Sequence, residues 1–225
     1  QDEAVDKLTS LLPDKYLSSP AAMALGTMGL EKANDSLIAT LKKTTDINVQ
    51  KNLVLALGNA KAEAAEALII PFVTSSDKEL KKNAIYALGR LGSKASLVVL
   101  DKAAKEVNYT MEPTNATMAY VDLLGRLLEK KESKLVAKSA SKLNKNASKA
   151  GATQTRIAAL ALEMKANPSQ VKKLVLTALK DKNKSYRYSA LLFANEKPSK
   201  ELYEAIVGYA KKADVSTKMD ISNFL

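Results

Sequence analysis

One short residue pattern recurs along this chain and constrains its fold more than any other feature. In the two clearest copies an aspartate, Asp46 or Asp77, is followed three positions later by an apolar residue and six positions later by an asparagine. An Ala-Leu-Gly triplet begins ten positions after each aspartate, and the two copies lie 31 residues apart. Repeats of this length are typical of chains that stack one supersecondary element pair on the next. The pattern therefore predicts an array in which each repeat contacts its neighbours.

Weaker copies extend the pattern over nearly the whole chain. Upstream, Asp14 leads to another Ala-Leu-Gly triplet, and downstream Pro113 leads to Leu-Leu-Gly. Copies without the glycine step open at Gly151 and Asp181, and a last one opens at Asp214. The successive spacings are 32, 31, 36, 38, 30 and 33 residues, a regularity that chance does not give. The sequence thus predicts seven repeat starts.

Within each repeat the residue types favour two helices. Aspartate, present at five of the seven starts, is a good N-cap because it accepts hydrogen bonds from the free amides of a first helical turn. The apolar residues that follow, at steps of three and four, fall on one helix face. A second helix with the same spacing follows, for example through Leu97, Leu100 and Ala104. Each repeat is predicted to be a helix, a short turn and a helix.

Glycine marks one position of the repeat. Four of the eight glycines end the triplet, and they are Gly26, Gly58, Gly89 and Gly125. A glycine inside a helix costs about 1 kcal/mol relative to alanine. Its recurrence at one position therefore indicates either the close approach of a neighbouring helix or an approaching helix end.

The amino-acid composition favours helices and excludes most of the common kinds of catalytic site. Apolar residues make up 46% of the chain, but aromatic residues only 5%, and Ala, Leu and Val dominate. That profile suits helices rather than a β-sandwich or barrel. The absence of Cys and His excludes disulfides, thiolate nucleophiles, the usual zinc sites and His acid–base chemistry. There is no Gly-rich phosphate loop or Gly-x-Ser-x-Gly elbow. We expect no catalytic residue, no metal site and no cofactor.

With its Ala-Leu-Gly triplets at 24–26, 56–58 and 87–89, the sequence resembles the HEAT-repeat family, in particular the bacterial type related to phycobilin-lyase-like repeats. The resemblance covers nearly the whole chain and is clear up to about residue 130. It implies an all-α fold of the HEAT/armadillo kind, an α-solenoid in which antiparallel helix pairs form a right-handed superhelix. It is highly specific for fold and hardly specific for function.

We expect residues 1–225 to form a single repeat array. A lone amphipathic helix over residues 2–12 is predicted to cap the first repeat, and further repeats start near 14, 46, 77, 113, 151 and 181. The repeat that opens at residue 214 is incomplete, and a repeat needs a neighbour to bury its apolar face. These features predict the N-terminal part of a longer protein, with a catalytic domain downstream.

The first residue, Gln1, is the only sequence feature that bears on location. It favours a mature form from which a secretory signal has been cleaved, hence a periplasmic or secreted protein, with a cytoplasmic fragment as the alternative. No apolar run approaches the roughly 18 residues of a membrane span.

A row of lysines is the most unusual local feature. The steps between its members are four, four, four, three and four residues, which places them on one helix face; they are Lys130, Lys134, Lys138, Lys142, Lys145 and Lys149. The family arrangement implies that this helix lines the concave surface. Two readings stay open: an anion-binding groove whose affinity falls with salt, and a solvated polar face that binds nothing.

Aromatic residues gather towards the C-terminus, where five lie within residues 186–209. Tyr186, beside Arg187 and two lysines, can stack on sugars or bases. The alternative is core filling in repeats that lack the glycine step. We favour core filling for the group and expect Tyr186 to be the exposed exception, part of a binding surface with Arg187 and the lysine row.

Two irregularities interrupt the repeat. The connection from Glu106 to Asn115 outgrows the others, either as a functional insertion on one face or as a benign length variant. Pro71 sits inside an apolar helix and is expected to kink that helix or end it early.

Three functions compete on this basis. The first is a non-catalytic, monomeric protein-interaction or scaffolding module whose partner is another protein or its own downstream domain. The second is nucleic-acid binding, since the net charge is +11. The alkylpurine DNA glycosylases with HEAT-like repeats depend on Trp and Arg for catalysis. This chain has no Trp and few Arg, which counts against the enzymatic version of this function. The third is a non-catalytic segment of a secreted bacterial polysaccharide-processing protein.

Overall fold

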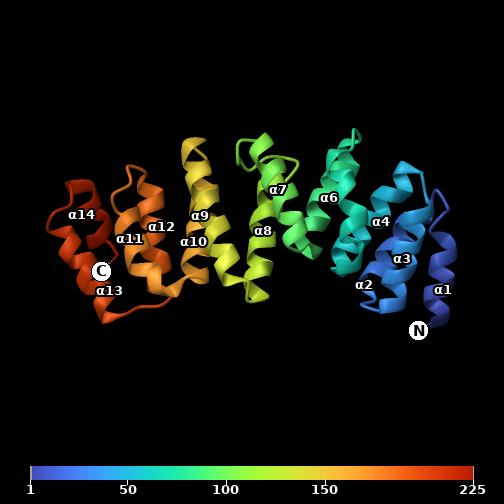
Figure 1. Cartoon of the computed structure of the whole chain (residues 1–225), viewed down its shortest axis with the longest axis horizontal. Coiled ribbons are helices and arrows are strands. Elements are labelled where there is room, and N and C mark those ends of the chain that lie inside the picture. Colours follow the sequence, from blue (N-terminus) through green and yellow to red (C-terminus); the bar gives the residue numbers. More distant parts are fainter. Residues whose placement is uncertain (1, 225) are drawn as a thin grey trace. The chain divides into compact units, whose positions relative to one another are not determined.

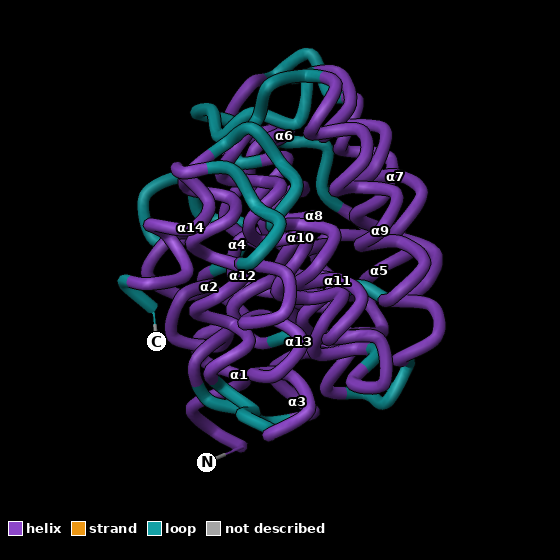
Figure 2. Tube along the Cα trace, turned by 90° about the vertical axis from the view of Figure 1, so that its left-hand side faces the viewer, coloured by secondary structure: helices purple, strands orange, loops and turns teal. Residues whose placement is uncertain are grey.

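The computed structural model describes residues 2–224, which form helices joined by short connections (Figure 1). No strand occurs in this part of the chain (Figure 2). The contacts divide it into two compact units. The N-terminal unit comprises residues 2–107 and 111–126, and the C-terminal unit comprises residues 108–110 and 127–224.

The N-terminal unit consists of helix pairs in chain order, with an additional helix, α1, at its start. The first helices of successive repeats, α2, α4 and α6, pack side by side, and the second helices form another layer against them. Its elements are α1 (Asp2–Leu11), α2 (Ser18–Thr27), α3 (Glu31–Lys43), α4 (Ile47–Ala60), η1 (Glu63–Ala65), α5 (Glu66–Ile69), η2 (Ile70–Thr74), α6 (Lys78–Leu91), α7 (Lys94–Glu106) and the start of α8 (Ala116–Glu129).

Glycine lets neighbouring first helices of this unit approach to backbone contact. A Cβ added at Gly26 would lie 2.7 Å from the carbonyl oxygen of Ala56, and one at Gly58 would lie 2.8 Å from the Cα of Ala87. The same relation joins Gly89 to Ala119 in α8. The glycine of one Ala-Leu-Gly step thus packs on the first residue of the step in the next repeat. At Gly125 a Cβ would meet no atom within 4 Å, so close approach explains three of the four glycines.

Aspartate caps α4 and α6, as the repeat predicted, but not α2, whose N-cap is Leu17, while Asp14 accepts from amides of the turn before that helix. The Asp46 side chain accepts hydrogen bonds from the amides of Asn48 and Val49, and Asp77 does the same at the start of α6. In the second layer, the first turn of α7 is held by a carboxylate from another helix. Glu66 Oε1 accepts from the backbone nitrogens of Ser93 and Ser96, at 2.7 and 3.1 Å. A carboxylate from one repeat therefore fixes the first turn of a helix in the next.

Proline breaks the second helix of the repeat that begins with α4. α5 ends at Ile69, and a 3₁₀ segment, η2, carries Pro71 in its first turn. The expected early end of this helix is confirmed. Proline lacks the N–H that an α-helix interior needs, so the chain continues in the tighter form.

The C-terminal unit continues the alternation of first and second helices. Its core contains a cluster of buried apolar residues from α10 to α14, among them Leu160, Val175, Leu191 and Ile206. Its elements are α9 (Ser133–Lys149), α10 (Thr153–Ala166), η3 (Pro168–Gln170), α11 (Val171–Ala178), α12 (Lys184–Asn195), α13 (Lys200–Ala210) and α14 (Val215–Ser222).

The connection after α7 is held by a buried tyrosine. Asn108 and Tyr109 both have left-handed backbone conformations, with φ of 51° and 55°. Within the C-terminal unit, the Tyr109 hydroxyl accepts a hydrogen bond from Asn146, and its carbonyl oxygen accepts one from Thr155 at 2.6 Å. Left-handed conformations at residues other than glycine persist only where surrounding contacts hold them. The start of this long connection is therefore fixed in place by the hydrogen bonds of Tyr109.

Candidate binding surface

The lysine row lies on the solvent side of α9. Its members from Lys134 to Lys149 belong to that helix and are exposed, while Lys130 is exposed in the turn before it. The opposite face of α9 carries buried residues and packs on α10; they are Val136, Ala140, Leu143 and Ala147. The predicted single-face stripe is therefore confirmed for the five lysines from Lys134 to Lys149, whereas Lys130 lies before the helix, separated from it by the left-handed Lys131. Whether it binds an anion stays a prediction.

Several members of the row carry uncompensated charge. Among the residues that the structure describes, Lys134, Lys138, Lys145 and Lys149 form no ion pair. Some lysines elsewhere in the chain do form ion pairs. Lys51, for example, contacts two carboxylates at 3.1 Å each. Like charges on one helix face repel one another, and an anionic partner would relieve that repulsion.

Tyr186 is not exposed, and the prediction that it would be is wrong. Only 5% of Tyr186 is exposed. The predicted helix start, Asp181, is not the N-cap of α12; Asn183 is, and its side chain accepts from the Tyr186 amide. A shift of two residues turns a helix position by about 200°. Tyr186 therefore sits three positions after the N-cap, an inward position that Val49 also occupies in its repeat.

Three side chains hold Tyr186 in place. The Arg156 guanidinium carbon lies 3.9 Å from the centroid of the Tyr186 ring, a stacked cation–π contact. Asn144 donates a hydrogen bond of 2.7 Å to the Tyr186 hydroxyl. Arg156 in turn pairs with both carboxylate oxygens of Asp181. The exposed tyrosine of α12 is Tyr188, at 44%.

Arg187 is also buried, which corrects its predicted place on a binding surface. Only 4% of it is exposed. Its Nε donates to Oδ2 of Asp220 in α14 at 2.7 Å, and its Nη2 lies 2.6 Å from the same oxygen in an ion pair. Further hydrogen bonds go to the carbonyl oxygens of Asp181 and Lys182 and to the Ser216 hydroxyl. All three nitrogens are engaged, so Arg187 joins α12 to α14 and offers nothing to a ligand.

An open hollow of about 410 Å³ lies beside the C-terminal half of the lysine row. Residues of α9, α10 and α11 line it, together with Asp181 and with Tyr186 of α12. Lys145 and Lys149 are the only members of the row that line it. Of the eight predicted surface residues, the structure thus brings three together at this hollow. Lys145 and Lys149 are exposed there, and Tyr186 lines the hollow although it is almost fully buried.

Sequence reasoning missed the residues that complete this hollow. Ser141 and Ser148 lie four residues before and three after Lys145, hence on the same helix face, and both line the hollow with Asn144. Their polarity beside the stripe was a usable signal. Glu163 and Thr177 come from other helices, and no local pattern indicates that they face the lysines.

The carboxylates of the hollow differ in their electrostatics. Burial raises the pKa of Glu163, and a hydrogen bond from Ser141 only partly opposes this. At Asp181 the hydrogen bond from Arg156 lowers the pKa, against a smaller effect of burial. Burial likewise raises the pKa of the Tyr186 phenol, while the hydrogen bond from Asn144 opposes the rise. The Asp181 charge is matched by Arg156, whereas Lys145 and Lys149 stay uncompensated.

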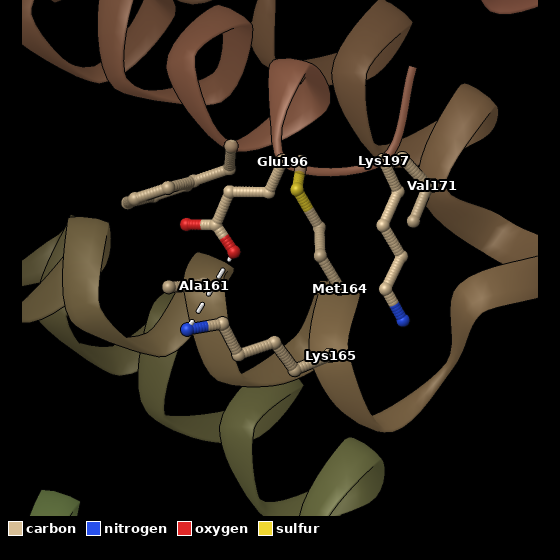
Figure 3. Close-up of a pocket in the computed structure, with 7 residues that line it drawn as sticks. Ala161, Met164, Lys165, Val171, Glu196 and Lys197 are labelled. Atoms are coloured by element: carbon tan, nitrogen blue, oxygen red, sulfur yellow. Dashed lines mark ion pairs between the residues drawn. The ribbon is translucent and has the colours of Figure 1, made fainter. Parts of the chain in front are cut away.

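A second, much smaller cavity lies between α10, α11 and α12 (Figure 3). Met164 and Phe193 line it, and an ion pair of 3.7 Å between Lys165 and Glu196 lies at its edge. Its volume of about 30 Å³ is close to that of one water molecule in the liquid. A small-molecule ligand does not fit there.

Charge is distributed very unequally between the two units. In sequence, residues 1–107 and 111–126 hold 15 basic and 15 acidic side chains, so their net charge is zero. Residues 108–110 and 127–225 hold 20 basic and 9 acidic side chains, a net charge of +11. The C-terminal unit therefore carries the whole net charge of the chain.

No cluster of three or more acidic side chains suited to a metal ion occurs within residues 2–224. In the same span, every helix is too short or too polar to cross a bilayer.

The fold defines a class of protein: an all-α repeat protein, an α-solenoid of helix pairs. Residues 34–119 match the sequence profile of HEAT repeats, which confirms the resemblance predicted from the Ala-Leu-Gly step. A solved structure of the complex of CpcE and CpcF of phycocyanin lyase from Nostoc sp. PCC7120 contains a chain of similar fold. The TM-score is 0.54 at 17% identity, and the match covers 98% of this chain and 92% of that one. No curated protein sequence matches the chain.

Proposed function

We propose that this protein is a non-catalytic interaction module that presents its helix array to a partner protein. The observation that carries the proposal is the difference in net charge between the units: the N-terminal unit is neutral, and the C-terminal unit has a net charge of +11. The match to HEAT repeats supports it, because arrays of this kind offer extended surfaces for binding. The similar chain in the complex of CpcE and CpcF is itself part of a two-protein assembly, which agrees with a role in association.

A crosslinking experiment in cells of the source organism tests this function. A photoreactive amino acid replaces Lys138, exposed in the C-terminal unit, or Lys43, exposed in the N-terminal unit. We expect one protein to crosslink at position 138 and none at 43. The purified partner should then bind with saturation in calorimetry and remain chemically unchanged. Failure to crosslink any protein at either position, or turnover of the partner, would contradict the proposal.

Nucleic-acid binding is the second candidate, favoured by the exposed lysines on one face of α9. Against it, the two arginines of the C-terminal unit are held in internal pairs with Asp181 and Asp220, and arginine is the preferred residue for phosphate and base edges. Retention on duplex DNA as salt rises from about 50 mM decides the matter. Lack of retention at the lowest salt would eliminate this candidate.

Secretion and a downstream catalytic domain remain predictions from the sequence alone. The coding sequence on either side of these 225 residues tests both. A signal peptide upstream and a further domain downstream are the expected findings, and an initiator Met followed by a stop codon after residue 225 would refute them.

A further inference from the structure

The hollow between α9 and α11 combines two features that an anionic segment of a protein requires. Lys145 and Lys149 lie one helical turn apart at its side, about 6 Å along the helix axis. Neither forms an ion pair in the part of the chain that the structure describes. Both are exposed, so their ammonium groups are accessible to a ligand in the hollow.

The rest of the lining offers apolar contact and neutral hydrogen-bonding groups. Leu174 of α11, which is partly exposed, contributes apolar surface. Asn144 and Thr177 add an amide and a hydroxyl. A volume of about 410 Å³ is within the range of sites that hold a ligand of a few side chains. A ligand that fits this lining has negative charge next to an apolar group.

We propose that this hollow binds an acidic segment of a partner protein, in which carboxylates meet Lys145 and Lys149 and an apolar side chain packs on Leu174. The proposal rests on the interaction function proposed above and names the site and the chemistry of the partner. Charge complementarity carries it, since the whole net charge of +11 belongs to this unit.

A nucleic acid fits the same hollow less well. A phosphate backbone carries a charge at every nucleotide, so it would also bring negative charge against Asp181 and Glu163, which line the hollow. A protein segment can place its carboxylates at Lys145 and Lys149 alone and its apolar side chain on Leu174. Arg156, which also lines the hollow, is already paired with Asp181 and stacked on Tyr186.

Fluorescence anisotropy with a synthetic probe tests the proposal. The probe is a fluorescein-labelled peptide with one leucine flanked on each side by two glutamates. We expect saturable binding to the full chain. A peptide with glutamine for glutamate should lose most of the affinity, and one with serine for leucine should lose part of it. A labelled DNA duplex of similar charge serves as the competing class.

Two double charge reversals on the same helix separate a specific site from general attraction. Lys145→Glu with Lys149→Glu changes the hollow, and Lys134→Glu with Lys138→Glu makes the same change of net charge outside it. We expect about tenfold weaker peptide binding for the first pair and about twofold for the second. All four positions are exposed, so circular dichroism should show unchanged folding in both variants.

Equal weakening by the two pairs would overturn the proposal, as would tighter binding of the duplex than of the peptide. A hollow filled by Thr177→Trp should abolish peptide binding, and unchanged affinity in that variant would also overturn it. The crosslinking experiment keeps the two hypotheses apart. If a partner crosslinks at position 138 but the peptide does not bind, the interaction function stands and this site assignment fails.

Discussion

The two units hold their helices together by different means. In the N-terminal unit, glycine and alanine bring first helices into backbone contact, as at Gly58 and Ala87. In the C-terminal unit the position twelve residues after the N-cap holds Met164 in α10 and Asn195 in α12 instead of glycine. There, side chains such as Arg187 and Asp220 link successive first helices. Polar links between first helices also occur in the N-terminal unit, as between Lys51 of α4 and Glu79 of α6, so the backbone contact at glycine is what distinguishes that unit.

The units differ in their surfaces as well. Lysines of the neutral N-terminal unit can find carboxylates, as Lys51 does with Asp77 and Glu79. In the C-terminal unit, where basic residues exceed acidic ones, Lys134, Lys138, Lys145 and Lys149 of α9 form no ion pair among the described residues. The comparison teaches that a repeat array can keep one half neutral and concentrate its net charge in the other.

The largest expected effect concerns the buried ion pair of the C-terminal unit. Arg187→Met keeps much of the side-chain volume but leaves the Asp220 carboxylate buried without its partner. We expect a loss of about 3–5 kcal/mol in the free energy of unfolding, measured by urea denaturation. Hydrogen exchange should show the loss in α12 and α14. Lys184→Met, an exposed change on the same helix, should stay within about 0.5 kcal/mol. Similar effects of the two variants would argue against the polar link.

Glycine packing is tested by a matched pair in the N-terminal unit. Gly58→Ala places a Cβ 2.8 Å from the Cα of Ala87, so backbone must move, at a cost of about 1–3 kcal/mol. Gly125→Ala meets no atom within 4 Å and should gain up to about 1 kcal/mol from helix propensity. Thermal unfolding of both variants measures the difference. A stabilising Gly58→Ala would refute close approach as the reason for that glycine.

The corrected start of α12 predicts a smaller effect. Asn183→Ala removes the side chain that accepts from the Tyr186 amide and should cost about 1 kcal/mol. Asp181→Ala, by contrast, removes the Arg156 partner and leaves the cap in place. In urea denaturation combined with near-ultraviolet circular dichroism, only the Asp181 variant should alter the environment of Tyr186. An unchanged stability of Asn183→Ala would restore Asp181 as the cap.

The Asp181–Arg156 pair predicts a pH dependence. The hydrogen bond from Arg156 holds the pKa of Asp181 below its ordinary value of 3.8. A carboxylate with a lowered pKa in the folded state stabilises the protein above its unfolded pKa, and that contribution disappears as the pH falls through the folded value. The stability advantage of the native chain over Asp181→Asn should therefore be constant near neutral pH and shrink below about pH 4. Denaturation curves at a series of pH values measure it, and an advantage that grows on acidification would contradict the pairing.

The fold class could be predicted because residues close together in the sequence define each repeat. Aspartate caps, steps of three and four, and the glycine position all act within one or two helices, and Asp46 and Asp77 behave as expected. The C-terminal unit was harder to predict, because the roles of its polar residues depend on distant partners. Asp181 pairs with Arg156, a residue 25 positions away, while Asn183 is the N-cap of α12 and Tyr186 faces inward.

The candidate site could be predicted only in part. The lysine row follows from helical spacing, and α9 presents it to solvent. The hollow requires α9 and α11 to stand on either side of α10, an arrangement that no local pattern in residues 133–178 indicates. Arg187 illustrates the opposite error. A basic residue beside tyrosines suggests a binding surface, but its partner Asp220 lies 33 positions later in the chain.

Hydrogen–deuterium exchange of the full chain, with and without the acidic peptide that contains leucine, tests the central claim most directly. We predict slower exchange confined to the C-terminal half of α9, to α10 and to α11, with no change in residues 2–107. Slower exchange in the N-terminal unit, or spread evenly over both units, would contradict the claim that binding belongs to the basic unit and its hollow.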